Sequence, residues 1–130
     1  SREPLIAFNV NLGTSDLETA RVIAQRIRTS GGGLPALRAI GIRQHDLSGA
    51  RFFAQVSMNL LDWRQTSLAD AFARVLAEAG TEGTDVLHSE IVGLVPRGAT
   101  WPGMEMELAL REPARTIEGV YAARTVELPK

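Results

Sequence analysis

Apolar and polar residues alternate most regularly in residues 51–61, so this stretch predicts a strand with two unlike faces. The apolar face consists of Phe52, Ala54, Val56, Met58 and Leu60, and the polar face of Gln55, Ser57 and Asn59. These polar side chains are short and uncharged, whereas a sheet face in open water usually carries Lys, Glu and Thr. We therefore expect this face to meet a polar ligand or partner.

Residues 5–12 repeat the pattern near the N-terminus. The apolar set is Ile6, Phe8, Val10 and Leu12, and the opposite set is Ala7, Asn9 and Asn11. If the two strands are neighbours, their polar side chains form a single surface of neutral donors and acceptors. We call this surface the amide patch, and it comprises Asn9, Asn11, Gln55, Ser57 and Asn59.

The spacing after the first strand predicts an amphipathic helix. Ser15 is the expected N-cap, with Glu18 reaching back to it as in a capping box. Three glycines at positions 31–33 are expected to end the helix. A phosphate loop is disfavoured because such a loop opens a helix and closes with Lys and Ser or Thr. A contribution of the glycine N–H groups to binding an anion remains open.

A second helix is expected after residue 65. Either Thr66 or Ser67 is its N-cap, Asp70 holds the capping-box position, and Gly80 is its C-cap. Its buried stripe is expected to be Leu68, Phe72, Val75, Leu76 and Ala79.

Two weaker strands complete the pattern. Residues 34–43 predict an edge strand, because Pro35 lacks a ladder donor, and His45 in the turn that follows is interpreted as a turn residue in preference to a catalyst.

Residues 85–96 predict a strand closed by Pro96, with His88 and Glu90 on one side. The opposite side is expected to hold Leu87, Ser89 and Ile91. Glu90 is either an ordinary exposed glutamate or a group that binds a ligand amine or a partner's arginine.

The order strand, helix, strand, strand, helix, strand predicts an α+β fold, the ferredoxin-like βαββαβ plait, with an antiparallel sheet and both helices on one face. The first and third strands are expected side by side in the centre, with the amide patch uncovered. We expect one domain over residues 1–130, with a core at about 4–96 and an extension at 97–130. Residues 101–110 fit a strand or a short helix, and Ile117, Val120 and Tyr121 predict a helix within 111–126.

Composition narrows the classes of function. The 130 residues are 45% hydrophobic with a formal net charge of -1, which argues against a general nucleic-acid binder. No apolar run approaches the roughly 18 residues of a membrane span. The absence of cysteine excludes disulfides, thiolate catalysis and Cys-ligated zinc, and the two histidines are too far apart for a helical metal pair. We expect a cytoplasmic chain that is processed or cut from a longer protein.

Four blocks, at residues 5–12, 30–34, 54–60 and 89–96, closely resemble the C-terminal subdomain of glutamate formiminotransferase. The likeness covers residues 4–96, extends more loosely to 113–118, and leaves 97–112 shorter than expected. It implies transfer of a formimino group from N-formimino-L-glutamate to tetrahydrofolate, in histidine degradation and one-carbon metabolism. It also implies a folate cleft between two subdomains, with the catalytic histidine in an N-terminal subdomain outside this chain. Neither His45 nor His88 lies in a matching motif, so we assign no catalytic residue.

The resemblance and the residues meet at the amide patch. Together with Glu90, it is expected either to bind the reduced folate or to brace the interface with the N-terminal subdomain, which is in the same or a separate chain. Tetrahydrofolate is the expected co-substrate, and no metal is expected. The alternatives are a non-enzymatic small-molecule-binding or dimerisation module, in which two copies pair, and a domain kept only for assembly. The isolated chain is expected to be inactive.

Overall fold

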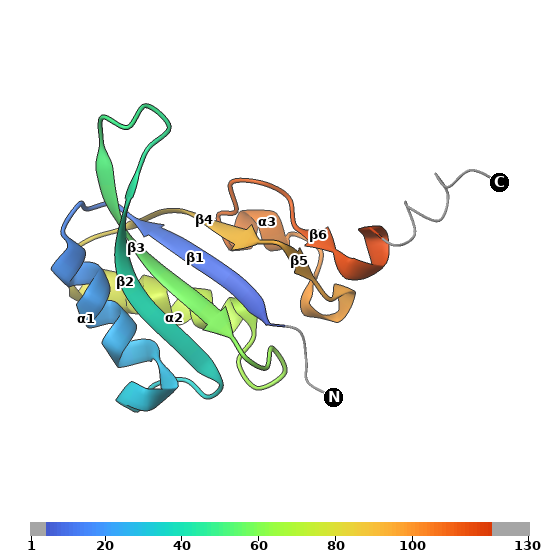
Figure 1. The fold of residues 1–130 in the computed structure, drawn as a ribbon. Helices are drawn as coiled ribbons and strands as arrows, with labels where there is room; N and C mark the ends of the chain where they lie inside the picture. Colours follow the sequence, from blue (N-terminus) through green and yellow to red (C-terminus); the bar gives the residue numbers. More distant parts are fainter. Residues whose placement is uncertain (1–4, 121–130) are drawn as a thin grey trace.

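A four-stranded antiparallel sheet with two helices on one face forms the centre of the computed structural model, which describes residues 5–120 (Figure 1). The strands are β1 (Ile6–Leu12), β2 (Leu37–His45), β3 (Phe52–Leu60) and β4 (Val86–Val92), and the helices are α1 (Leu17–Ile27) and α2 (Leu68–Thr81). The strand order β2-β3-β1-β4 is that of the ferredoxin-like plait. The predicted fold, the central pairing of β1 with β3 and the edge position of β2 are therefore confirmed.

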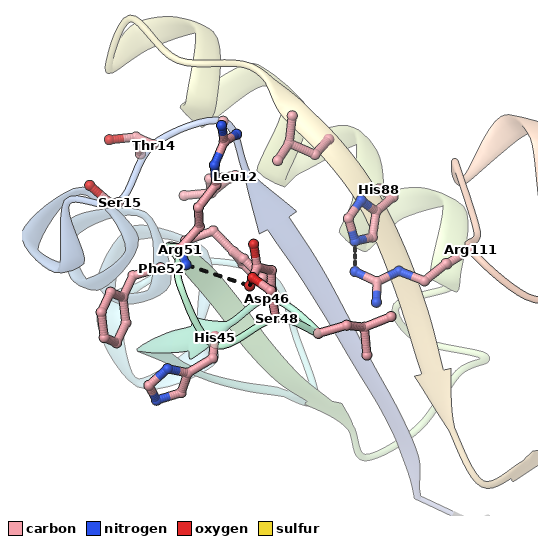
Figure 2. A pocket seen from close by; sticks show the side chains of 14 residues that line it. Leu12, Thr14, Ser15, His45, Asp46, Ser48, Arg51, Phe52, His88 and Arg111 are labelled. Carbon is pink, nitrogen blue, oxygen red and sulfur yellow. Dashed lines mark hydrogen bonds between the residues drawn. The ribbon is translucent and has the colours of Figure 1, made fainter.

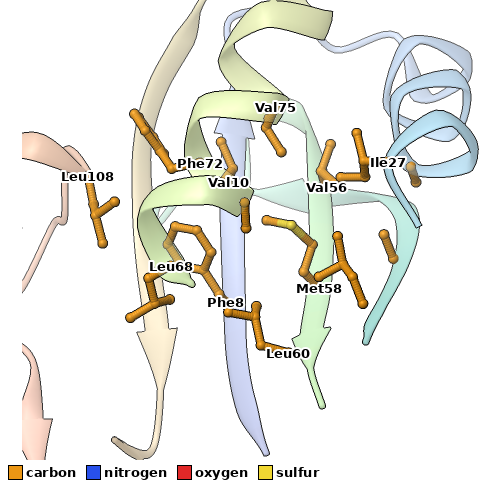
Figure 3. Close-up of a cluster of buried hydrophobic side chains, with 14 of the residues drawn as sticks. Phe8, Val10, Ile27, Val56, Met58, Leu60, Leu68, Phe72, Val75 and Leu108 are labelled. Atoms are coloured by element: carbon orange, nitrogen blue, oxygen red, sulfur yellow. The ribbon is translucent and has the colours of Figure 1, made fainter. Parts of the chain in front are cut away.

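The register of β1 and β3 brings their apolar faces together. Ile6 lies opposite Leu60, and Val10 lies opposite Val56. All four side chains are fully buried. Figure 3 shows the β1 and β3 side chains packed against Phe72 and other apolar residues of α2. Burying each such side chain contributes about 1.5–3 kcal/mol, so the alternating pattern determines which face receives the helices.

The N-cap of α1 is Asp16, so the expectation of Ser15 in that position was wrong by one residue. The Asp16 carboxylate accepts hydrogen bonds from the Glu18 backbone N–H at 3.1 Å and from the Thr19 hydroxyl at 3.0 Å. A carboxylate at this end also interacts favourably with the helix dipole.

α1 ends before the three glycines, at Ile27, and its C-cap is Arg28 in an extended conformation. The expectation that the glycines end this helix was therefore wrong. The chain passes through a 3₁₀ turn, η1 (Thr29–Gly31), and Gly32 then adopts a left-handed φ of 83°. A Cβ on Gly31 would lie 1.9 Å from the Gln25 carbonyl oxygen, and one on Gly33 would lie 2.3 Å from the Ile27 carbonyl oxygen. The run of glycines is thus required for the chain to fold back against the helix end.

The capping box of α2 is present. Ser67 Oγ accepts from the Asp70 N–H at 3.0 Å, and the Asp70 carboxylate accepts from the Ser67 N–H at 3.4 Å. The predicted end at Gly80 was wrong, because the helix continues to Thr81. Leu76, expected in the buried stripe, is 49% exposed.

The stripe of α2 that contacts the sheet runs through Leu68, Ala71, Phe72, Val75 and Ala79. Leu76 follows Val75 by one residue, which turns its side chain by about 100° away from that line. The Leu76 side chain is therefore directed away from the sheet and is partly exposed to solvent.

At Gly41 in β2, the backbone of α1 lies close against the sheet. A Cβ there would lie 2.4 Å from the backbone nitrogen of Arg21 and 2.6 Å from the carbonyl carbon of Ala20. The glycine is needed because the helix backbone occupies the space that a side chain would fill.

The C-terminal third departs from the sequence expectation at two points. The strand expected over 85–96 divides at Gly93, whose φ is 85°. The two residues of β5 (Leu94–Val95) leave the main sheet and pair in parallel with β6 (Arg115–Thr116). Between them lie a 3₁₀ turn, η2 (Arg97–Ala99), and a short helix, α3 (Met104–Glu107).

The helix expected within 111–126 begins only after β6. Residues 117–120 are helical, and residues from Tyr121 onward lie outside the described part of the chain. Of the two interpretations of residues 101–110, the short helix is present. Within residues 5–120, no helix combines the length and the apolar content needed to cross a membrane.

Candidate functional site

The amide patch forms on the sheet face that the helices leave open. In the β1–β3 ladder, Asn11 lies opposite Gln55 and Asn9 lies opposite Ser57. Asn59 pairs with Ala7 at the other end of the same face. The structure therefore brings all five predicted residues together.

The outer strands extend this patch into cross-strand rows. One row reads Ile42, Gln55, Asn11, His88; the next reads Ile40, Ser57, Asn9, Glu90; the third reads Arg38, Asn59, Ala7, Val92. Glu90 thus adjoins Asn9 and borders the amide patch. Amides occupy the middle of the face, with aliphatic side chains of β2 along one border.

One end of the amide patch is buried, and the other end is exposed to solvent. Asn11 is 0% exposed and Gln55 is 2% exposed, whereas Asn59 is exposed. Gln55 Nε2 donates to Asn11 Oδ1 at 2.7 Å, and Asn11 Nδ2 donates to His88 Nε2 at 2.6 Å. Within the described residues, the buried Gln55 Oε1 accepts no hydrogen bond. Buried polar atoms are almost always paired, so this oxygen is an unusual unpaired acceptor within the buried end of the patch.

His88 is held as a neutral imidazole. The Arg111 guanidinium also donates to Nε2, and a guanidinium has no acceptor. Nε2 must therefore carry the lone pair, which places the proton on Nδ1. Partial burial lowers the pKa of His88 first, and the charge of Arg111 lowers it further, while Glu90 acts in the opposite direction.

Arg111 reaches His88 because Ser89 binds the C-terminal segment. The Ser89 N–H donates to the Ala109 carbonyl at 2.9 Å, and the Arg111 N–H donates to the Ser89 carbonyl at 2.9 Å. Ser89 Oγ also donates to the Leu108 carbonyl at 2.6 Å. Ser89 itself is fully buried, so these three bonds fix where the Arg111 side chain begins.

Sequence reasoning missed Arg111. The available signal was Ser89, a hydroxyl on the helix-facing side of a predicted strand, which must find a buried partner. Nothing in the sequence indicated that the partner would be the segment that carries Arg111.

A hollow of about 790 Å³ opens beside His88 at one end of the sheet (Figure 2). Its walls come from the β2–β3 hairpin, the end of β1 and the start of β4, and Arg51 and Arg111 both line it. Leu87 lines it as well and is 51% exposed. This contradicts the prediction that Leu87 would point away from His88.

The displacement of Leu87 results from a β-bulge. Asn11 pairs with His88, but the next residue, Leu12, pairs with Val86. Leu87 is therefore the extra residue of the bulge, and the alternation of sides is lost at this point.

His45 belongs to the hairpin. It is the last residue of β2 and stacks on Phe52, with ring centroids 4.5 Å apart. A second hollow of about 380 Å³ contains Glu90 and Arg115 and shares Arg111 with the first. In the described residues, no three His, Asp or Glu side chains are grouped so that they could hold a metal ion.

Comparison with known proteins gives a consistent result. Residues 7–105 match the family described as the formiminotransferase domain. The chain is similar to the glutamate formimidoyltransferase of Streptococcus pyogenes serotype M1, at 43% identity over 99 residues, which are 76% of this chain and 32% of that protein. It is also similar to the glutamate formimidoyltransferase of Thermoplasma acidophilum, at 40% identity over 76% of this chain and 31% of that protein.

Longer relatives match over the same region. The formimidoyltransferase-cyclodeaminase of Mus musculus is 38% identical over 102 residues, covering 74% of this chain and 18% of that protein. The chain thus spans about a third of the length of the glutamate formimidoyltransferases that it matches, and less of the longer relatives.

Proposed function

This chain belongs to the formiminotransferase domain family, and from that premise we propose that it is the folate-side subdomain of a glutamate formiminotransferase. In the proposed reaction the formimino carbon leaves the nitrogen of N-formimino-L-glutamate and bonds to N5 of tetrahydrofolate. The N5 proton is transferred to the departing nitrogen, so the products are glutamate and 5-formiminotetrahydrofolate. The setting is the cytoplasm, in histidine degradation and one-carbon metabolism, as the resemblance implies.

The open face of the sheet is the observation that carries this proposal. Asn9, Ser57 and Asn59 supply neutral donors and acceptors that helices do not cover. A reduced pterin needs several directed hydrogen bonds and carries no net charge, so it suits such a surface. Ile40 and Val92, at opposite borders of the face, are 57% and 54% exposed. These apolar borders suit packing against a second sheet.

The second sheet is that of an N-terminal formiminotransferase subdomain, in the same or a separate chain. Its contribution is the catalytic histidine. Nε2 of His88 already accepts from Asn11 and Arg111, so it cannot take a substrate proton without losing both contacts. His45 stacks on Phe52 at the hairpin, away from the amide patch. We therefore expect no turnover by this chain alone.

Reconstitution tests this proposal. The chain is mixed with a purified N-terminal half of a glutamate formimidoyltransferase, and transfer to tetrahydrofolate is followed by the absorbance of the product. Turnover by the mixture but by neither part supports the proposal. Turnover by this chain alone would show that the chemistry lies within it, and no turnover with any N-terminal half would reject the transferase assignment.

A binding measurement addresses the open face directly. Tetrahydrofolate is titrated into the wild-type chain, the Asn9→Ala variant and the Gln25→Ala variant, with amide chemical shifts as the readout. Gln25 is exposed on α1, on the other side of the sheet. The Gln25→Ala variant is therefore the control, because it also removes a side-chain amide but not from the open face. We expect Asn9→Ala to weaken binding by about fivefold, because a neutral hydrogen bond contributes about 1 kcal/mol. Equal binding by both variants would place the folate elsewhere.

A further inference from the structure

Arg111 is a cation without an acidic partner among the described residues. Its side chain is exposed and lines both hollows, and no carboxylate of residues 5–120 forms an ion pair with it. Arg111 contacts the neutral ring of His88, and this contact uses one of the five N–H donors of the guanidinium. The remaining donors are available to an anion.

The guanidinium is nevertheless held in place. Its backbone is fixed by the hydrogen bond to Ser89, and its head by the lone pair of His88 Nε2. His88 is in turn held by Asn11, which is held by Gln55. Figure 2 shows Arg111 reaching His88 from outside β4. A guanidinium that is already oriented loses less side-chain entropy when it binds a carboxylate through its planar fork.

The larger hollow adds a second cation and apolar walls. Arg51 lines it from the hairpin, and the apolar part of its lining includes Phe52, Phe53 and Leu87. Asp46 is the one carboxylate in the lining, and Ser48 Oγ and the Arg51 backbone N–H already donate to it. The lining therefore favours a ligand that carries a carboxylate on an apolar or aromatic group.

We propose that this hollow is a carboxylate subsite for a glutamyl group, in which Arg111 binds the carboxylate and His88 is the positioning residue that orients Arg111. This inference rests on the proposed function, because both co-substrates carry a glutamyl group. Tetrahydrofolate bears it on an aminobenzoyl ring, which the apolar walls would contact. N-formimino-L-glutamate has no such ring.

Separate ligands distinguish the two sources. Isothermal titration of the chain with p-aminobenzoyl-L-glutamate, L-glutamate and a tetrahydropterin without the aminobenzoyl-glutamate tail separates the glutamyl group, the ring and the pterin. We expect p-aminobenzoyl-L-glutamate to bind and L-glutamate to bind at least tenfold more weakly. Equal binding of the two would assign the subsite to N-formimino-L-glutamate.

Variants identify the residues. Arg111→Gln should weaken p-aminobenzoyl-L-glutamate binding by at least about tenfold, because hydrogen bonds between charged groups are the stronger kind. Arg111→Lys should recover part of the loss, since it keeps the charge without the fork. The control is Arg21→Gln on α1, where the side chain is 58% exposed, and it should bind as the wild type does. Tetrahydropterin binding should be unchanged in all three.

The positioning role of His88 has its own test. His88→Gln keeps an acceptor for Arg111 and should retain affinity within about threefold, whereas His88→Leu should lose as much as Arg111→Gln. The double variant His88→Leu/Arg111→Gln should bind no more weakly than either single variant, because both changes remove the same interaction. Additive losses would reduce His88 to a structural role. Thermal unfolding of each variant verifies that it is folded.

The two proposals can fail separately. If tetrahydrofolate binds and Arg111→Gln does not weaken it, the subsite is wrong and the folate assignment stands. If p-aminobenzoyl-L-glutamate binds through Arg111 but tetrahydrofolate is not a substrate of the reconstituted enzyme, the subsite stands and the proposed function is wrong. Absence of binding by every glutamyl compound to the wild-type chain would overturn the subsite.

Discussion

Asn11 lies directly opposite Gln55 across the two central strands, and its carbonyl oxygen accepts a 2.7 Å hydrogen bond from Gln55 Nε2. This pair joins the open face of the sheet to the hollow beside His88, because the other end of the Asn11 amide donates to the imidazole. Asn11 is thus a link with two partners. Among residues 5–120, Gln55 has the Asn11 side chain as its one side-chain partner, and its Oε1 accepts no hydrogen bond.

The difference between these two amides predicts unequal costs of removal. Asn11→Leu leaves the buried Gln55 Nε2 without its acceptor and removes one of the two donors to His88 Nε2, so it should lower the free energy of unfolding by about 1–3 kcal/mol. Gln55→Met should cost less, about 1 kcal/mol or under, because it also removes an acceptor that already lacks a donor. Urea denaturation of both variants measures the difference. A larger cost for Gln55→Met than for Asn11→Leu would contradict the hydrogen bonds that join Gln55, Asn11 and His88.

Gly41 and Gly80 form a matched pair for testing how closely α1 approaches the sheet. Gly41→Ala should lower the free energy of unfolding by about 1–3 kcal/mol, because the new methyl group would meet the helix backbone at 2.4 Å. Gly80 lies within α2, and no atom lies within 4 Å of its Cβ position. Gly80→Ala should therefore raise stability by up to about 1 kcal/mol. Thermal unfolding compares the two, and a neutral Gly41→Ala would show that α1 can move away.

Helix capping gives a prediction in which the sequence and the structure disagree. Ser67→Ala removes the observed cap of α2 and should cost about 0.5–2 kcal/mol. Ser15→Ala should change stability by less than about 0.5 kcal/mol, because Asp16 is the cap of α1. Urea denaturation distinguishes them. A cost at Ser15 as large as that at Ser67 would restore Ser15 as the cap.

His88 predicts a loss of stability on acidification. Its pKa in the folded chain lies below its usual value of 6.5, so between these two pKa values the unfolded chain binds more protons than the folded chain. Stability should therefore fall as pH drops through 6.5 and should stop falling, from this group, below the folded pKa. Asn11 and Arg111, which both donate to Nε2, would lose their contacts on protonation, while the charge of Glu90 favours the protonated form.

The measurement is urea denaturation at several pH values, with His88→Gln as the matched variant. That variant should lack the part of the slope that lies just below pH 6.5. A parallel pH profile for wild type and variant would assign the slope to other groups. A proton NMR titration of the His88 ring would report its pKa directly.

The arrangement of the sheet could be predicted because two strands with strict alternation leave one choice of buried face. Phe8 and Met58 must face the helices if Asn9 and Ser57 do not. The amide patch followed from the same argument. What the sequence could not show was that part of this patch would be buried, since burial depends on the hairpin and on residues near 111.

Arg111 and Leu87 were missed for related reasons. A β-bulge shifts one residue without leaving a mark in the hydrophobic pattern, so Leu87 was assigned to the wrong side. The contact between Arg111 and His88 depends on a chain path that turns back after Gly93 and passes Ala109, whose φ is 53°. Such a turn at an alanine has no sequence signal, because non-glycine residues rarely adopt it.

Ser89 has a consequence for self-association. The backbone N–H and C=O of Ser89 on the outer edge of β4 are both hydrogen-bonded to the segment 109–111. A strand from another molecule therefore finds no continuous row of unpaired backbone groups along this edge. Within the four-stranded sheet of the described residues, β2 is then the outer strand that still has an open edge. A sheet that extends from molecule to molecule needs two open edges on each molecule. A sheet with one open edge can pair with one neighbour, which leaves no edge for a third molecule.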